Sequence, residues 1–147
     1  MADAVSTIVI LDNAYDYVVH LTNISDGTGE SLVNKVDKSA LAVALPVAGA
    51  AAAEAVALDL QQADWNVQGF TSVRLFWDHA ADSTMAVFSG NGYKDFRGKG
   101  DLQNLNMTSG LKDPKTADST GDVLLTTAGT VSGNTYDITL WFKKRAV

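Results

Sequence analysis

The feature that most constrains this chain is a series of short segments in which apolar and polar residues alternate. In Thr71–Asp78 the residues Val73, Leu75 and Trp77 would share one face, and Thr135–Lys143 alternates strictly along its length. Successive side chains of a β-strand point to opposite faces of a sheet, so a period of two predicts a strand with one buried face. Turn-forming residues separate these segments, which favours short connections between antiparallel strands.

Six further segments carry the same alternation or a run of β-branched apolar residues. They are Thr7–Leu11, Tyr17–Thr22, Ser31–Val36, Val56–Val67, Thr84–Ser89 and Asp122–Thr127. No long helical pattern falls between them, which disfavours folds built from alternating strands and helices. We therefore predict one all-β domain over residues 1–147. Its expected architecture is an antiparallel, jelly-roll-like β-sandwich of about eight short strands with short flexible termini.

Two stretches interrupt this pattern. Ser39–Ala55 is rich in alanine, but Pro46 and Gly49 limit it to a loop with one or two helical turns. Gly90–Gly92 predicts a turn, and Tyr93–Asp118 is polar and punctuated by glycine. We expect Tyr93–Asp118 to form one long loop, and loops of that length are often functional.

Composition excludes several classes of site and partner. The chain has no cysteine, which removes disulfides, thiolate nucleophiles and zinc–thiolate sites and fits synthesis in a reducing cytoplasm. Its net charge is −6 and its one basic cluster is Lys143–Arg145, so we expect neither nucleic acid nor an anionic membrane as partner. The longest apolar stretch, Ala40–Leu60, is interrupted by Pro46, Glu54 and Asp59, and we predict no transmembrane helix.

No pattern in the sequence predicts catalysis. The chain has two histidines, His20 and His79, and Asp82 and Ser83 follow His79 closely. A Ser–His–Asp triad is defined by geometry rather than adjacency, and no Gly-x-Ser-x-Gly motif supports one here. The carboxylates are scattered and none lies in an EF-hand register. We predict a protein that is not an enzyme and holds no cofactor or metal.

Several strings of the chain resemble virion structural proteins of tailed bacteriophages. The resemblance runs in order across nearly the whole chain and is carried by His20–Ser31, Lys35–Leu41, Gln68–Asp78, Gly121–Gly129 and Ser132–Leu140. It is weakest over Ala42–Ala55 and Gln103–Thr108. The resemblance implies a capsid decoration (cement) protein that binds the outer surface of the major capsid shell and stabilises it. It carries no catalytic residues.

The resemblance also implies a partner and a location. The partner would be the major capsid protein, and the chain would form a homotrimer on the virion surface after synthesis in the host cytoplasm. We take Tyr93, Phe96 and Arg97 of the expected long loop as candidate interface residues. Trp141 joins them because it is an aromatic residue on the polar face of the last strand, and exposed aromatic residues are enriched at interfaces.

Two other functions remain open from the sequence. The first is a phage tail or tail-tube component, which would share the fold class but assemble into rings. The second is a carbohydrate-binding β-sandwich that uses exposed tryptophan or tyrosine rings as platforms for sugars.

Overall fold

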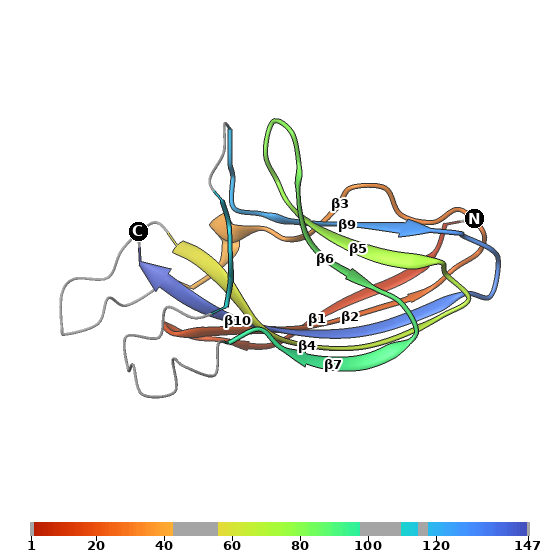
Figure 1. Ribbon diagram of the computed structural model, residues 1–147, viewed down its shortest axis with the longest axis horizontal. Coiled ribbons are helices and arrows are strands. Elements are labelled where there is room, and N and C mark those ends of the chain that lie inside the picture. Colours follow the sequence, from red (N-terminus) through yellow and green to blue (C-terminus); the bar gives the residue numbers. More distant parts are fainter. Residues whose placement is uncertain (1, 43–55, 98–109, 115–117, 147) are drawn as a thin grey trace.

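The computed structural model describes residues 2–42, 56–97, 110–114 and 118–146, and in these residues the chain is almost entirely β-structure. Two antiparallel sheets pack face to face (Figure 1). In order, the first sheet holds β1 (Ala4–Asp12), β2 (Asp16–Ile24), β10 (Thr135–Ala146), β4 (Val56–Gln68) and β7 (Asn91–Asp95), with β8 (Leu111–Lys112) also pairing with β4. The second holds β3 (Val33–Val36), β9 (Val123–Ala128), β5 (Ser72–Trp77) and β6 (Ser83–Phe88). The predicted all-β sandwich is confirmed.

The strand pairs are nested inside one another. β5 pairs with β6, β4 with β7, β3 with β9 and β2 with β10. Two further pairs, β10 with β4 and β9 with β5, connect the nested pairs into two sheets. This is the strand order of a jelly roll. β1 and β8 lie outside the nested set of eight strands.

The core lies between the sheets and consists of the alternate side chains that point inward from each strand. Tyr136, Ile138, Leu140 and Phe142 of β10 are all buried, as the strict alternation of that segment predicted. Opposite them lie residues of the second sheet, which include Val73, Leu75, Trp77 and Leu125. Trp65 packs against this core and stacks on Phe88 with ring centroids 4.7 Å apart.

The expected long loop is partly wrong. Asn91–Asp95 forms β7, and Tyr93 lies opposite Asp64 of β4. Leu111–Lys112 also pairs with β4, as the short strand β8. Both segments are polar or short and have weak intrinsic strand preference, so the long edge of β4, rather than propensity, sets their conformation. Residues 98–109 and 115–117 lie outside the described residues.

The alanine-rich segment is described only at its start. Lys38–Ala40 forms a single 3-10 turn, for which the Asp37 carboxylate accepts a hydrogen bond from the backbone N–H of Ser39. Residues 43–55, on which the rest of that prediction falls, lie outside the described part of the chain. β1 begins at Ala4, three residues before the predicted strand Thr7–Leu11.

Candidate functional site: an exposed edge strand

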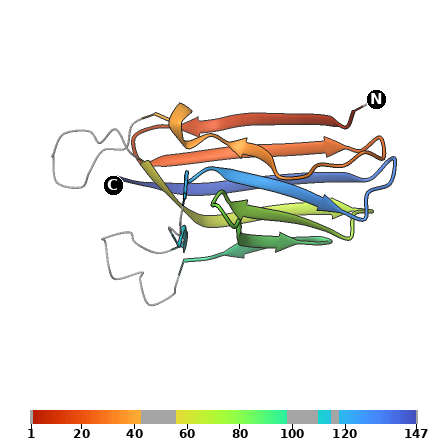
Figure 2. The same ribbon diagram turned by 90° about the horizontal axis from the view of Figure 1, so that it is seen from above.

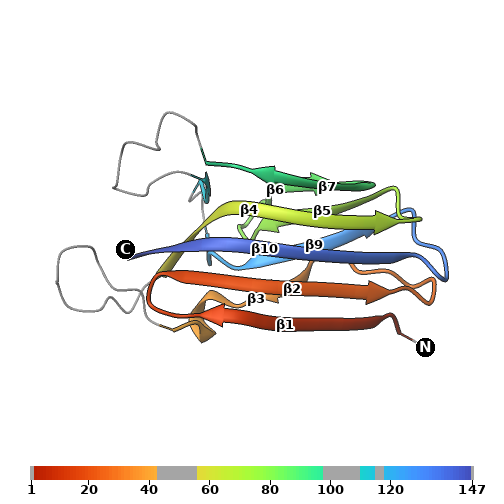
Figure 3. The ribbon, with the colours of Figure 1, turned by 90° about the horizontal axis from the view of Figure 1, so that it is seen from below.

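The most unusual element of the structure is β1. Within the described residues it pairs only with β2, so one of its long edges has no strand beside it (Figures 2 and 3). All nine of its residues are exposed. Five of them are large and apolar, with 40% to 59% of their surface accessible: Val5, Ile8, Val9, Ile10 and Leu11. A strand this apolar would normally be buried on at least one face.

The inner face of β1 is exposed because the second sheet does not cover it. Val9 lies opposite Val19 of β2, so both side chains point to the same side of the sheet. Val19 is fully buried, whereas Val9 is 51% exposed. Val33, on the edge strand of the second sheet, is also exposed although its partner Leu125 is buried. The apolar interior of the sandwich therefore continues to the surface along this side.

The two edges of the first sheet differ in a way that marks β1 as special. β7 has five residues, including Lys94 and Asp95, and Arg97 follows it. The Arg97 guanidinium donates two hydrogen bonds to the Asp95 carboxylate, at 3.0 and 2.8 Å. Short length and charge are the usual protection of an edge strand against association. β1 is nearly twice as long, and no residue from Ala4 to Leu11 carries a charge.

A β-bulge at Ile10 shapes the outer surface beside β1. Val9 pairs with Val19 and Leu11 pairs with Val18, so Ile10 is the extra residue. The bulge moves Leu11 to the outer face of the sheet, because it lies opposite the outward-pointing Val18. A shallow depression of about 370 Å³ opens there, lined by Ile10, Leu11 and Val18 together with Trp141 and Gln62 of the next strands.

Carboxylates hold β1 at both of its ends. Before the strand, Asp3 accepts hydrogen bonds from the Ser25 hydroxyl at 3.1 Å and from the Asn23 amide at 3.0 Å. At its end, Asp12 accepts a charge-assisted hydrogen bond from the fully buried Lys144 ammonium. Asp12 also accepts one from the backbone N–H of Ala42 at 3.1 Å. The edge is therefore fixed in place before it meets any partner, which lowers the entropy lost on binding.

The ionisation of Asp3 follows from its hydrogen bonds. Burial opposes the charged form of this carboxyl. The hydrogen bonds from the Asn23 side chain and from the backbone N–H groups of Asp26 and Gly29 outweigh burial and lower the pKa of Asp3 to about 2. Asp3 is thus an anion that is fully engaged within its own chain.

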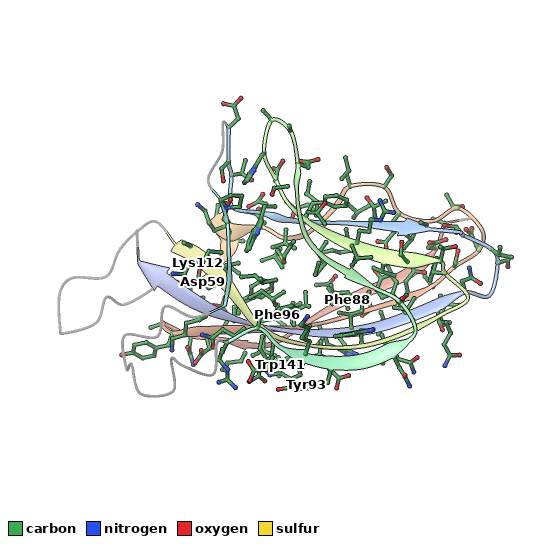
Figure 4. All side chains as sticks on the ribbon, viewed as in Figure 1. Asp59, Phe88, Tyr93, Phe96, Lys112 and Trp141 are labelled. Atoms are coloured by element: carbon green, nitrogen blue, oxygen red, sulfur yellow. The ribbon has the colours of Figure 1, made fainter. Side chains whose placement is uncertain are left out.

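The four interface residues predicted from sequence lie in different environments. Trp141 and Tyr93 point away from the core on the outer face of the first sheet, and Tyr93 is 58% exposed (Figure 4). Phe96 packs instead against the buried core. Arg97 is paired with Asp95. Trp141 alone among the four lies beside β1, through the depression that it shares with Ile10 and Leu11.

The histidines do not form a catalytic triad in the described residues. His79 Nε2 contacts Asp113 Oδ1 at 2.5 Å, and Ser119 Oγ donates to the other oxygen of Asp113 at 2.6 Å. A nucleophilic serine needs the imidazole between itself and the carboxylate, whereas here the carboxylate lies in the middle. Asp82 accepts from the backbone N–H of His79, and Ser83 begins β6. His20 contacts the exposed Asp137 at 2.6 Å.

Comparisons with known proteins add no assignment. A search against family models, curated proteins and solved structures finds no match to this chain. Within the described ranges, no group of three or more histidine, aspartate or glutamate side chains is arranged to hold a metal ion. The same residues include no helix of the length and hydropathy needed to cross a membrane.

The sequence did not identify β1 as a site. Its segment Thr7–Leu11 was expected to be a strand like the others, because a continuous apolar run is typical of a buried strand. The available signal was the lack of alternation between Val5 and Leu11 combined with the lack of charge.

Proposed function

We propose that this protein is a structural component of a larger assembly and that it acts by binding other protein chains along β1. One observation carries the proposal: β1 is a fixed and exposed edge strand that carries no charge from Ala4 to Leu11. An extended segment placed beside it would form main-chain hydrogen bonds with the free edge. Val5 and Ile8, on opposite faces of the strand, would supply apolar contact on either side.

The assembly that we propose is the virion of a tailed bacteriophage, with this chain on the outside of the major capsid shell. The support is the resemblance of five separate strings to virion structural proteins of such phages. Jelly rolls occur in viral capsid proteins but also in lectins, so the fold is compatible with this role without deciding it. Bridging neighbouring capsid subunits would add contact area across the seams at which a shell under internal pressure opens.

The depression beside Trp141 fits an apolar side chain of a protein partner. Five of its eight lining residues are apolar, namely Ile10, Leu11, Val18, Trp141 and Phe142. An aliphatic or aromatic side chain of a protein fits such a lining. The other three, Asp16, Gln61 and Gln62, are polar partners of the kind that sugar hydroxyls require, so carbohydrate binding stays the alternative at this place.

A sedimentation assay with empty shells of the cognate major capsid protein tests the proposal. The informative variant is Ile8→Lys, because a lysine on an edge strand opposes further strand pairing. Val87→Lys is the matched control, since Val87 is equally exposed and lies on β6, an edge strand of the second sheet. We expect the wild type and Val87→Lys to co-sediment with shells and Ile8→Lys to bind at least about tenfold more weakly. Equal binding by all three proteins, or no binding by the wild type, would overturn the proposal.

A further inference from the structure

We infer that the strand that pairs with β1 is β1 of a second copy of this chain, so that two molecules join edge to edge around a two-fold axis. This inference rests on the proposed role of β1 as a docking edge and names the partner that occupies the edge when no capsid shell is bound to it. The pairing would join the first sheets of the two molecules into one continuous sheet. It uses only β1, which lies outside the nested strands of the jelly roll.

The side chains of β1 are complementary to themselves in an antiparallel pairing. The regular part of the strand runs from Ala4 to the bulge at Ile10, and its midpoint is Thr7. A two-fold axis perpendicular to the sheet at Thr7 keeps each face of the sheet on its own side. Val5 of one copy then lies opposite Val9 of the other, on the inner face. Two exposed valine pairs are covered in this way, one on each side of the axis.

Electrostatics at the edge favour a second copy over a charged segment. Each chain carries a net charge of −6, but Ala4–Leu11 contributes none of it. The nearest carboxylates are already engaged, Asp12 with Lys144 and Asp3 with Asn23 and Ser25. Two β1 strands therefore meet without like-charge contact, which would otherwise oppose pairing. A basic segment would find no unengaged carboxylate along β1 to attract it.

The size of the edge predicts how strong the dimer is. The paired part of the strand, Ala4–Ile10, is about 24 Å long and a sheet layer is about 10 Å thick, so the contact covers about 240 Å² on each copy. The total of about 500 Å² is below the roughly 1,000 Å² of a stable interface. We therefore expect a reversible dimer that dissociates at about 1 μM and forms at about 500 μM. A hydrogen-bonded edge accepts one strand, so this pairing gives a dimer and not the trimer expected from the resemblance.

Sedimentation velocity between about 1 and 500 μM tests the inference with the variants already introduced. We expect the wild type and Val87→Lys to shift from monomer to dimer as concentration rises, and Ile8→Lys to remain monomeric throughout. A wild type that stays monomeric, a dimer that survives Ile8→Lys, or a trimer would overturn the inference. Far-UV circular dichroism checks that Ile8→Lys keeps the β fold, which we expect because Ile8 is 53% exposed.

A second measurement tests the register without relying on loss of association. The chain has no cysteine, so a single introduced thiol can form only an intermolecular disulfide. We expect Thr7→Cys to cross-link under mild oxidation much faster than Val87→Cys at the same concentration. Equal rates would contradict pairing at β1. These measurements also distinguish the two proposals. A protein that stays monomeric but still binds shells through β1 overturns the dimer alone. A protein that dimerises but does not bind shells overturns the capsid role alone.

Discussion

The Tyr136 hydroxyl donates a hydrogen bond of 2.6 Å to Glu30 Oε2, and both residues are buried. The same oxygen accepts from the Asn23 amide at 3.0 Å, and the other oxygen of Glu30 accepts from the Lys35 ammonium. Asn23 also donates to Asp3. The residue that precedes β1 is therefore tied through Asn23 and Glu30 to the core strand β10.

Removal of the Tyr136 hydroxyl tests this network. Burial, reinforced by the hydrogen bond to Glu30, raises the pKa of Tyr136, so the hydroxyl remains a donor throughout the working pH range. We expect Tyr136→Phe to lower the free energy of unfolding by about 1–3 kcal/mol, because it leaves a buried carboxylate short of one donor. Urea unfolding measures this value. Tyr93→Phe, at an exposed site, should stay within about 0.5 kcal/mol of the wild type, and equal losses in both variants would contradict the network.

The loss of folding stability at low pH should depend on Asp3. Its pKa is about 2 in the folded chain against 3.8 in the unfolded chain, so the folded state binds fewer protons in this interval. Asp3 therefore stabilises the fold above about pH 4, and this contribution is lost as the pH falls towards 2. We expect the unfolding free energy of Asp3→Asn to fall less steeply than that of the wild type over this window. Parallel curves for the two proteins would show that Asp3 is not responsible.

Two isoleucines of the first sheet should respond very differently to the same substitution. Ile138 on β10 is fully buried, whereas Ile8 on β1 is 53% exposed. Ile138→Ala should lower the unfolding free energy by about 2–5 kcal/mol through lost burial and the cavity left behind. Ile8→Ala should change it by less than about 1 kcal/mol. A large loss at Ile8 in dilute monomer would mean that β1 is part of the core and not a docking edge.

Two glycines with positive φ separate backbone strain from steric clash. A Cβ at Gly129 would lie 2.9 Å from the backbone nitrogen of Thr71, whereas a Cβ at Gly90 meets nothing within 4 Å. Gly90→Ala should therefore lower the unfolding free energy by about 1–2 kcal/mol, the cost of a left-handed alanine. Gly129→Ala adds the clash and should lose about 1–3 kcal/mol more. Thermal unfolding that ranks Gly90→Ala as the worse variant would contradict the described turn at Gly129.

The strands with the clearest alternation in the sequence are β10 and β5, which have two sheet neighbours and one buried face. Their alternation is complete because each inward position packs against the core. The edge strands β1, β3 and β6 were also predicted, from β-branched apolar residues or from a shorter alternation. β7 was not predicted, because it begins with the turn-forming pair Asn91–Gly92 and its other residues are mostly polar. The nested pairing could not be predicted from the sequence either, because it joins segments as distant as β2 and β10 and leaves no local pattern.

The candidate site was harder to predict than the fold. An uncharged apolar run such as Val5–Leu11 is typical of a strand buried on both faces, and sequence cannot tell that case from an open edge. The engagement of Asp12 by Lys144 joins residues far apart in the chain. Trp141 was singled out correctly as an outward-facing aromatic residue, but its place beside Ile10 depends on the β-bulge, which the sequence did not indicate.

The central claim is that β1 is a docking edge, and amide hydrogen exchange tests it most directly. Alternate N–H groups of β1 point away from β2 and are open to solvent in the isolated chain. We expect exchange over Ala4–Leu11 to slow at least about tenfold when the chain is assembled, either at about 500 μM or on capsid shells, while exchange in β6 and β7 stays the same. Unchanged exchange in β1, with new protection at β6 or β7, would contradict the claim.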